Sequence, residues 1–263
     1  MNNFLSEILE LKQKRVELAK SNNNIESLKN HSFSVRSRAT SHALRKKLEA
    51  DDTIHIIAEI KRASPSKGII NDKIDVAEVA QMYERGGATA ISVLTEEDRF
   101  GGSLADLKVA RKSVKIPILR KDFVFDEFQI YEAAAAGADV ILLIVAMLDD
   151  TKLFRLKRLI EDNLKLDALV EVHTLEELER AKAVNSKIIG VNNRDLNSFN
   201  VSLDVSRELI KHAPKDALMI AESGLQTKED LLELKELGYK GFLIGETLMR
   251  SGNPEVELKN LIN

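Results

Sequence analysis

Short apolar segments alternate with longer amphipathic segments along most of this chain. The apolar runs are rich in Ile, Val and Leu and lie at residues 54–60, 88–94, 116–119, 140–145, 168–172, 188–191, 218–221 and 241–244. Such runs are typical of parallel strands that are covered on both faces. The segments between them, such as VAEVAQMYERGG and KEDLLELKELG, have the apolar spacing of helices. The pattern therefore predicts eight strands alternating with helices.

Glycines mark three joints where a helix gives way to a strand: YERGGATAISVL, YEAAAAGADVILL and LKELGYKGFLI. A glycine past a helix end adopts the left-handed conformation that turns the chain into the next element. Repeated strand–helix–strand units form parallel sheets, and eight strands favour closure into a (β/α)8 TIM barrel. An open doubly wound sheet is the alternative, and the lack of a Gly-rich dinucleotide fingerprint after the first strand counts against it.

The first fifty residues lie outside this repeat. They begin with apolar residues at helical spacing, namely Phe4, Ile8, Leu11 and Leu18. This spacing predicts a helix over 4–19 that ends at the asparagines 22–24, followed by a basic helix that ends near Leu48. We expect an N-terminal helical extension over 1–50 and a barrel catalytic domain over 51–263, together forming one structural domain. The extension is expected to be a lid on one barrel end, and contact with a substrate is the alternative.

Composition narrows the class of protein. The chain of 263 residues contains no cysteine, which excludes disulfides, thiolate catalysis and cysteine-ligated metals. A formal net charge of −3 gives no reason to expect a nucleic-acid or anionic-membrane partner. The strongest apolar run, 138–148, contains Asp139 and is shorter than the ~20 residues of a membrane helix. Because the charged N-terminal segment also lacks a secretory signal, we expect a cytoplasmic protein.

Charged residues gather at the strand ends, where the reactive groups of parallel barrels lie. Glu59 and Lys61 end the first strand and, being two residues apart, point to the same side. Lys121 follows the third strand, Glu171 lies in the fifth, and Glu222 ends the seventh. A single strand-end charge is ordinarily a solvated rim residue. Glu171 and Glu222 directly follow apolar runs, however, so they need cationic partners, for which Lys61 and Lys121 are candidates. Such a cluster shifts pKa values for proton transfer.

The loops after the seventh and eighth strands predict an anion site. They read ESGLQTKED and IGETLMR, each with a glycine before a helix start, where backbone amides favour an anion. We expect a phosphate at Gly224 and Gly245, with the Ser-rich loop RASPSKG after the first strand folding over it. The carboxylate of Glu246 would repel a phosphate, so we expect its side chain to turn away and only its backbone to bind.

Six segments, in the same order as in the family, resemble the indole-3-glycerol-phosphate synthases of tryptophan biosynthesis. They are IIAEIKRASPSKG, ILRKDFVFDEFQIYEAAAAGAD, LVEVHTLEELERA, IGVNNRDL, AESGL and FLIGETLMR, and the resemblance covers nearly the whole chain. It implies a carboxy-lyase that closes the ring of 1-(2-carboxyphenylamino)-1-deoxyribulose 5-phosphate with loss of carbon dioxide and water. It implies no redox cofactor and no metal, a phosphorylated small-molecule substrate, and possible contact with other tryptophan-pathway enzymes.

The resemblance also implies roles for the proton-transfer residues. Lys121 would be the general acid that protonates the ketone oxygen, and Glu171 the partner that takes or returns protons during dehydration. Lys61 would pair with the substrate carboxylate, oriented by Glu59.

The remaining candidate residues would bind the substrate. Asn192 and Glu222 would hydrogen-bond its hydroxyls and amine, with Ser223 beside them and Arg194 supporting Asn192. The phosphate would be held by Gly224, Gly245, the backbone of Glu246, and Ser64.

Two other functions are compatible with the residues alone. One is another phosphosugar-handling barrel enzyme such as an isomerase, which would favour a carboxylate or cysteine acid–base pair and would release no carbon dioxide. The other is a non-catalytic barrel that binds phosphorylated ligands, which would bind substrate without turnover.

Overall fold

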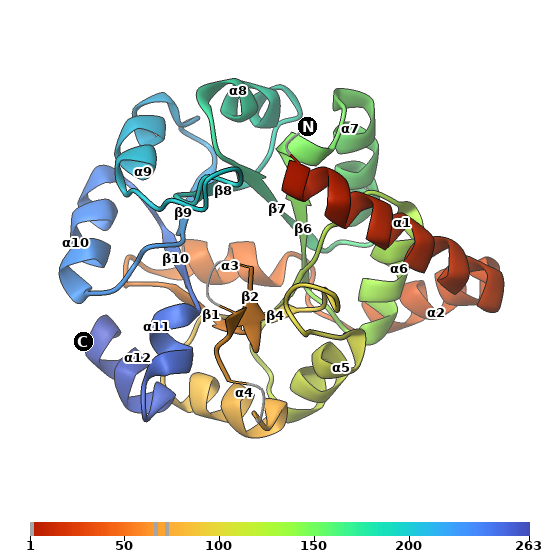
Figure 1. Ribbon diagram of the computed structural model, residues 1–263, viewed down its shortest axis with the longest axis horizontal. Coiled ribbons are helices and arrows are strands. Elements are labelled where there is room, and N and C mark those ends of the chain that lie inside the picture. The colour runs from red at the N-terminus through yellow and green to blue at the C-terminus, as the bar shows by residue number, and fades with distance from the viewer. Residues whose placement is uncertain (1–2, 66–67, 72–73) are drawn as a thin grey trace.

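The chain folds into a closed barrel of eight parallel strands, as the ribbon in Figure 1 shows. The computed structural model describes residues 3–65, 68–71 and 74–263. The strands pair in the order β1-β10-β9-β8-β7-β6-β5-β4, and the last closes on the first with Ala58 opposite Ile244. They are β1 (Ile56–Ile60), β4 (Ala90–Leu94), β5 (Ile118–Lys121), β6 (Val140–Ile144), β7 (Asp167–Val172), β8 (Ile188–Asn192), β9 (Leu218–Glu222) and β10 (Gly241–Ile244). The TIM-barrel prediction is confirmed, and the open sheet is wrong.

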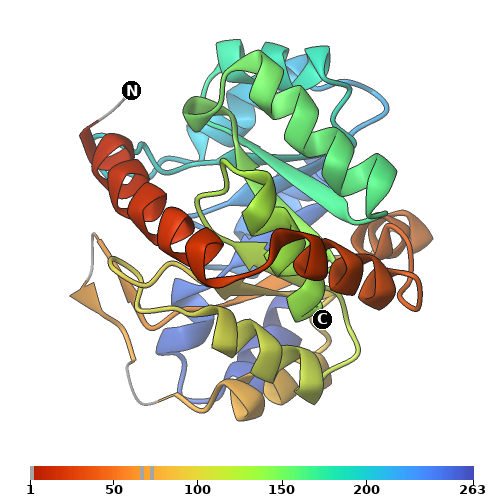
Figure 2. The same ribbon diagram turned by 90° about the vertical axis from the view of Figure 1, so that its right-hand side faces the viewer.

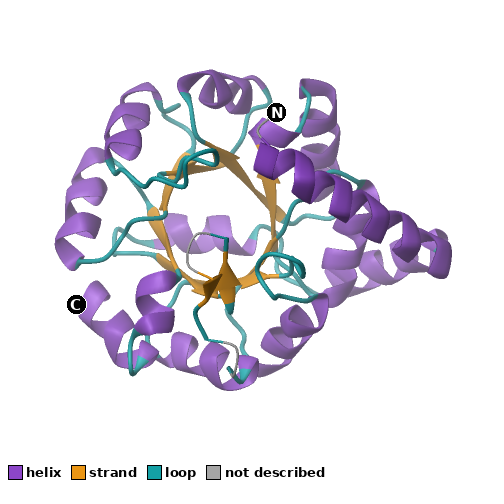
Figure 3. Cartoon of the chain, viewed as in Figure 1, coloured by secondary structure: helices purple, strands orange, loops and turns teal. Residues whose placement is uncertain are grey.

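Helices form a ring outside the strands (Figure 3). They are α4 (Val76–Arg85), α5 (Leu104–Ser113), α6 (Glu127–Ala136), α7 (Asp150–Arg158) with η2 (Leu159–Asn163), α8 (Leu175–Ala183), α9 (Asp204–Leu209) with η3 (Ile210–His212), α10 (Lys228–Leu237) and α12 (Pro254–Ile262). Two short helices, η1 (Val145–Met147) and α11 (Glu246–Arg250), follow β6 and β10. The predicted glycine joints are present, with Gly87, Gly137 and Gly238 at φ of 93°, 93° and 117°. These left-handed residues turn the chain from a helix toward the next strand.

The predicted strands agree with the structure to within two residues, and the third differs most. It was expected at 116–119, but β5 is Ile118–Lys121 and therefore includes the charged Arg120 and Lys121. The prediction placed this strand two residues too early because it followed the apolar residues alone. The loop after β1 contains a small antiparallel hairpin, β2 (Ala63–Ser64) with β3 (Gly68–Ile69), that was not predicted. Residues 66–67 of the RASPSKG loop lie outside the described residues.

Three helices precede the barrel: α1 (Asn3–Asn22), α2 (Ile25–Arg36) and α3 (Ala43–Ala50). Asn24 caps α2 by accepting a hydrogen bond from the backbone N–H of Ser27 at 3.0 Å, so the predicted break at the asparagines is confirmed. The prediction of a single second helix is wrong. The chain leaves helical geometry between α2 and α3, where His42 has a left-handed φ of 50°.

The extension spans the barrel from one end to the other (Figures 1 and 2). At the C-terminal ends of the strands, Lys12 of α1 forms an ion pair with Asp122 at 2.8 Å. Helix α2 packs beside α6, and α3 crosses the opposite end, where the N–H of Leu44 donates to Asp167 at 2.9 Å. The expected lid on one end is therefore wrong, because the extension contacts both ends.

No helix in the described ranges is both long and apolar enough to cross a membrane.

Arg36 anchors α2 to the base of the barrel, and its removal is expected to destabilise the fold. Its guanidinium is buried and pairs with Asp139 at 3.0 Å, while also donating to backbone carbonyls such as that of Leu164. Breaking a buried ion pair costs about 3–5 kcal/mol. Because Asp139 keeps a second partner in Arg111, we expect Arg36→Met to lower the free energy of unfolding by about 3 kcal/mol, the lower end of that range.

Urea unfolding measures this difference. The exposed Arg38 provides the matched control, and Arg38→Met is expected to stay within about 0.5 kcal/mol of the wild type. Equal stability of the two variants would show that Arg36 does not hold the extension in place.

Candidate active site

The C-terminal ends of the strands surround a cavity of about 1010 Å³. All twelve residues singled out from the sequence line it, from six strand ends and the loops that follow them: Glu59, Lys61, Ser64, Lys121, Glu171, Asn192, Arg194, Glu222, Ser223, Gly224, Gly245 and Glu246. A cavity of this size accommodates a small phosphorylated metabolite.

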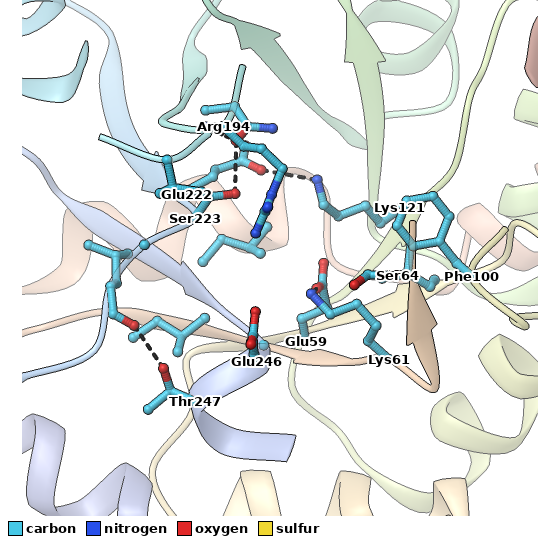
Figure 4. A pocket seen from close by; sticks show the side chains of 18 of the residues that line it. Glu59, Lys61, Ser64, Phe100, Lys121, Arg194, Glu222, Ser223, Glu246 and Thr247 are labelled. Carbon is cyan, nitrogen blue, oxygen red and sulfur yellow. Dashed lines mark hydrogen bonds and ion pairs between the residues drawn. The ribbon is translucent and has the colours of Figure 1, made fainter. Parts of the chain in front are cut away.

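Lys121, the last residue of β5, lies at the centre of the cavity (Figure 4). Its Nζ is 3.1 Å from Glu171 Oε2 on β7 and 3.1 Å from Glu222 Oε2 on β9. The lysine side chain is 15% exposed and the two carboxylates 3% and 1%, so these charges face one another with little water between them. Of the two candidate partners, Lys121 rather than Lys61 is the one that pairs with both glutamates.

The three groups shift one another's pKa values. Burial alone would lower the pKa of Lys121, but Glu171, Glu222 and Glu59 outweigh it and hold that pKa well above its usual range. Burial would raise the pKa of Glu171, yet Lys121 and then His173 bring it well below its usual range. For Glu222, burial and repulsion from Glu171 exceed the attraction of Lys121 and raise its pKa to about 7. The site thus holds a firmly protonated lysine beside two unlike glutamates.

A second ammonium–carboxylate pair lies on β1 and the residue after it. Lys61 Nζ is 2.7 Å from Glu59 Oε1, and both side chains point into the cavity, as the two-residue spacing predicted. Gly245 leaves room for Glu59, because a Cβ at that position would lie 2.6 Å from Glu59 Oε1. Gly245 is therefore needed to make room for the Glu59 carboxylate, besides any role in a turn.

Asn192, at the end of β8, is fixed by two hydrogen bonds to its Oδ1. The Ser223 hydroxyl donates at 2.8 Å, and the backbone N–H of Arg194 donates at 3.0 Å. The expected support by Arg194 thus comes from its backbone, while its guanidinium donates to the Phe199 carbonyl at 3.1 Å. Ser223 has a left-handed φ of 68°, which is unfavourable for a residue with a side chain. Its bond to Asn192 helps to hold that conformation.

The loops after β9 and β10 meet at one side of the cavity. The Thr247 hydroxyl donates to the Leu225 carbonyl at 2.9 Å and so joins the two loops. Glu246 lines the cavity, and its Oε1 lies 3.1 Å from Arg250 Nε. A cation four residues later thus offsets its charge, and the expectation that its side chain turns away from a bound phosphate stays a prediction.

Several cavity residues were not found from the sequence. Phe4 of α1, with Phe100, Phe123 and Phe199, gives the cavity an aromatic wall. The ring centroids of Phe4 and Phe199 are 5.2 Å apart, in an edge-on contact. These residues come from a helix and three loops far apart in the chain, so no local pattern joins them. His173, next to Glu171, was also missed, although its two-residue spacing was a usable signal.

A cluster of carboxylates lies outside the cavity, in the loop after β4. The oxygens of Glu96, Glu97 and Asp98 are close enough to share a cation. Glu96 accepts hydrogen bonds from the backbone N–H groups of 98–100, Glu97 pairs with Lys12 at 3.2 Å, and Asp98 pairs with Arg15 at 2.7 Å. Protein groups therefore already compensate these charges.

Comparison with solved structures shows the fold. The chain is similar to a thiamine phosphate pyrophosphorylase from Pyrococcus furiosus, with a TM-score of 0.60 and 18% identity over 83% of this chain and 95% of that one. It is also similar to 3-hexulose-6-phosphate synthase from Salmonella typhimurium, with a TM-score of 0.61 and 14% identity over 79% and 96% of the two chains. At such identities the likeness extends to the fold alone.

Sequence comparison shows the family. The model of the indole-3-glycerol phosphate synthase family matches residues 5–261. The synthase of that name from Carboxydothermus hydrogenoformans is 43% identical over 98% of this chain and 99% of its own length. The Legionella pneumophila synthase is 41% identical over 100% and 99%, and that of Lachnoclostridium phytofermentans is 49% identical over 79% and 76%. The resemblance predicted from six motifs is confirmed, and the chain belongs to the indole-3-glycerol phosphate synthase family of carboxy-lyases.

Proposed function

We propose that Lys121 is the general acid of this enzyme and that Glu171 is its proton-transfer partner. The reaction of the family converts 1-(2-carboxyphenylamino)-1-deoxyribulose 5-phosphate to indole-3-glycerol phosphate, carbon dioxide and water. The observation that carries the assignment is the buried Lys121 ammonium, held at 3.1 Å from each of two glutamates. The match to the family over nearly the whole chain favours this reaction over an isomerisation or a non-catalytic barrel.

In the first step a bond forms between the ring carbon that bears the carboxylate and the ketone carbon of the sugar chain. The ketone oxygen becomes an alkoxide and takes a proton from Lys121 Nζ. An alkoxide is a far stronger base than an amine, so the raised pKa of Lys121 keeps the donor charged without preventing the transfer. Lys61, oriented by Glu59 at 2.7 Å, pairs with the substrate carboxylate during this step.

In the remaining steps the intermediate loses carbon dioxide and water. The carboxylate leaves as carbon dioxide, and its electron pair returns to the ring. The new C–OH bond then breaks: Glu171 takes a proton from the neighbouring carbon and returns it to the departing oxygen, which leaves as water, and Lys121 regains its proton from solvent. Glu171, ionised because its pKa lies well below the usual range, is the base in this dehydration. The two lost molecules account for every atom that the product lacks.

The other cavity residues orient the substrate. Asn192, Glu222 and Ser223 hydrogen-bond its hydroxyls and amine, and the aromatic wall contacts its ring. The phosphate binds at the other end of the substrate from the ring, on backbone N–H groups at Gly224, Gly245 and Glu246. The hydroxyl of Ser64 and the side chain of Arg194 also line the cavity. Clamps at two ends of the substrate bring its reacting carbons together.

The location and further partners of the enzyme are also proposals. We place it in the cytoplasm, because a chain without cysteine makes no use of an oxidising compartment. Contact with other tryptophan-pathway enzymes stays a prediction for co-purification to test.

The activity itself is tested by mixing purified protein with the anilino-ketose phosphate and following indole fluorescence and carbon dioxide release. Both products are expected in equal amounts. A rearranged sugar without carbon dioxide would replace the proposal with an isomerase, and bound substrate without product would replace it with a binding protein.

Substitution of Lys121 tests the general acid. We expect Lys121→Met to lower kcat by at least ~100-fold, the usual scale for loss of an acid–base group. Lys115→Met, which changes an exposed lysine before the same strand, is the matched control and should leave kcat unchanged. Circular dichroism checks that both variants are folded. A folded Lys121→Met enzyme with a near wild-type rate would remove Lys121 from the role.

The raised pKa of Glu222 predicts a pH dependence. Below a pH of about 7 its carboxyl group is increasingly protonated and stops accepting hydrogen bonds from the substrate, so kcat/KM is expected to fall toward acid. Glu222→Gln cannot titrate and should give a lower but flatter profile between pH 5.5 and 9. Because the substrate phosphate itself titrates near pH ~6, the difference between the two enzymes is the diagnostic quantity. Parallel profiles would show that Glu222 does not set the acid limb.

Adding one methyl group at Gly245 tests the anion cradle and its contact with Glu59. The new Cβ would lie 2.6 Å from Glu59 Oε1, so the loop or the carboxylate must move. We expect Gly245→Ala to weaken inhibition by inorganic phosphate at least ~10-fold, the equivalent of ~1.4 kcal/mol. Gly252→Ala is the matched control, since a Cβ there meets no atom within 4 Å. Equal inhibition constants for the two variants would move the anion site elsewhere.

A further inference from the structure

His173 lies between two carboxylates, one of which, Glu171, lines the cavity. It follows β7 directly, and its Nε2 is 3.3 Å from Glu171 Oε1. Its Nδ1 is 3.2 Å from Oε2 of Glu177, in the first turn of α8, and the same oxygen accepts the backbone N–H of His173 at 2.7 Å. The imidazole is only 11% exposed, so it faces both carboxylates with little water present. The two carboxylates favour the charged imidazolium. Its Nδ1 pairs with Glu177, while its Nε2 lies close to Glu171 without a hydrogen-bond partner among the described residues.

The two glutamates that contact Lys121 have different surroundings on their second oxygens. Oε1 of Glu171 faces His173 at 3.3 Å. Oε1 of Glu222 is buried and has no hydrogen-bond partner among the described residues. Glu171 therefore lies beside two cations, Lys121 and His173, whereas Glu222 lies beside Lys121 and must share it with Glu171. Since both lie 3.1 Å from the same Lys121 Nζ, the contact of His173 with Glu171 is one feature that makes them unequal, and the repulsion of Glu222 by Glu59 is another.

We infer that His173 is a positioning residue that acts through Glu171: as an imidazolium it keeps Glu171 a carboxylate until dehydration begins, so that a proton bound by either glutamate before that step lies on Glu222. The inference rests on the proposed roles of Lys121 and Glu171. When Lys121 transfers its proton, both glutamates lose the attraction of its charge. His173 is not part of that transfer and keeps its positive charge. Glu171 therefore remains the base when dehydration begins.

The other charged groups around the pair agree with this assignment. Lys121 faces it from β5, Glu222 from β9, Glu59 from β1 and Glu177 from α8. The strands on either side of β7, which are β6 and β8, and the adjoining η1 carry no charged side chain. Burial alone would lower the pKa of His173, but Glu171 and Glu177 outweigh it and raise it to about 10. The imidazolium therefore persists across the neutral range.

The location of the proton is tested by infrared difference spectroscopy, in which a protonated carboxyl group has its own C=O band. Between pH 5 and 8, the titrating band of the wild type should disappear in Glu222→Gln, because Glu171 stays ionised. The scan is then extended below pH 5, where adding His173→Asn to that variant should move the onset of the Glu171 carboxyl band to a higher pH than in the single variant. Identical spectra of the single and double variants would overturn the inference.

Kinetics gives a second readout. In the wild-type background, His173→Asn should lower kcat at pH 7 about tenfold, because Glu171 then loses the one cation that remains beside it after Lys121 has transferred its proton, while KM changes less than twofold. The matched control is His212→Asn, an exposed histidine 3.7 Å from Glu208, which should change neither. If His173→Asn does not fold, Glu177→Gln removes one of the two carboxylates that hold the cation, and it should lower kcat at pH 7 by a smaller factor. A wild-type kcat in either folded variant contradicts the inference.

Failure of the inference can be told from failure of the proposed function. If Glu171→Gln keeps a wild-type rate, the role of Glu171 as base is wrong, and the spectra still report where the proton lies. If Glu171→Gln is inactive but the His173→Asn profile matches the wild type, the proposed function stands and only the role of His173 is wrong.

Discussion

The ion pairs of Lys121 with Glu171 and Glu222 are the interaction on which this cavity depends. A buried charge is tolerated only when its partner is in place, and here the three groups come from β5, β7 and β9. They meet only because the barrel is closed. Gly190 of β8, between the two glutamate strands, contributes by having no side chain, since a Cβ there would lie 2.1 Å from Glu222 Oε1. Gly190 thus leaves room for the Glu222 side chain to extend over β8 toward Lys121.

A second set of charges holds the strand end that carries Lys121. Its neighbour Asp122 accepts a hydrogen bond from Thr95 at 2.6 Å and pairs with Arg120 at 3.0 Å and with Lys12 at 2.8 Å. Burial would raise the pKa of Asp122, but Arg120 and Lys12 lower it to about 2. Lys121 faces the cavity while the residues on either side of it are held by this outer network. The N-terminal helix therefore supports the centre of the site through Lys12, as well as lining it through Phe4.

The sequence predicted the barrel, the strand-end charges and the loop glycines from short-range patterns, whereas cavity residues such as Asn192 and Ser223 were implied by the family resemblance. Glu171 stood out as a carboxylate between two valines, and the two-residue spacing of Glu59 and Lys61 fixed their common side. The pairing of the lysines could not be predicted, since it depends on how strands distant in the chain curve toward one another. The contact of Lys12 with Asp122 could not be predicted either, because Lys12 is one of many polar residues in an ordinary amphipathic helix. The pairing of Glu246 with Arg250, four residues on, was not predicted either, although this spacing is a usable signal in a helix.

The reach of the first fifty residues has a consequence for how this chain is made. Lys12, Arg36 and Leu44 bind Asp122, Asp139 and Asp167, partners that lie 110, 103 and 123 residues later in the chain. Translation therefore delivers the first three helices long before any surface exists to receive them, and the barrel cannot close until β10 has left the ribosome. The N-terminal segment is therefore made first but docks late, after its partners in the barrel have been made. A nascent polypeptide therefore has no working cavity until β10 and the loop after it have been added.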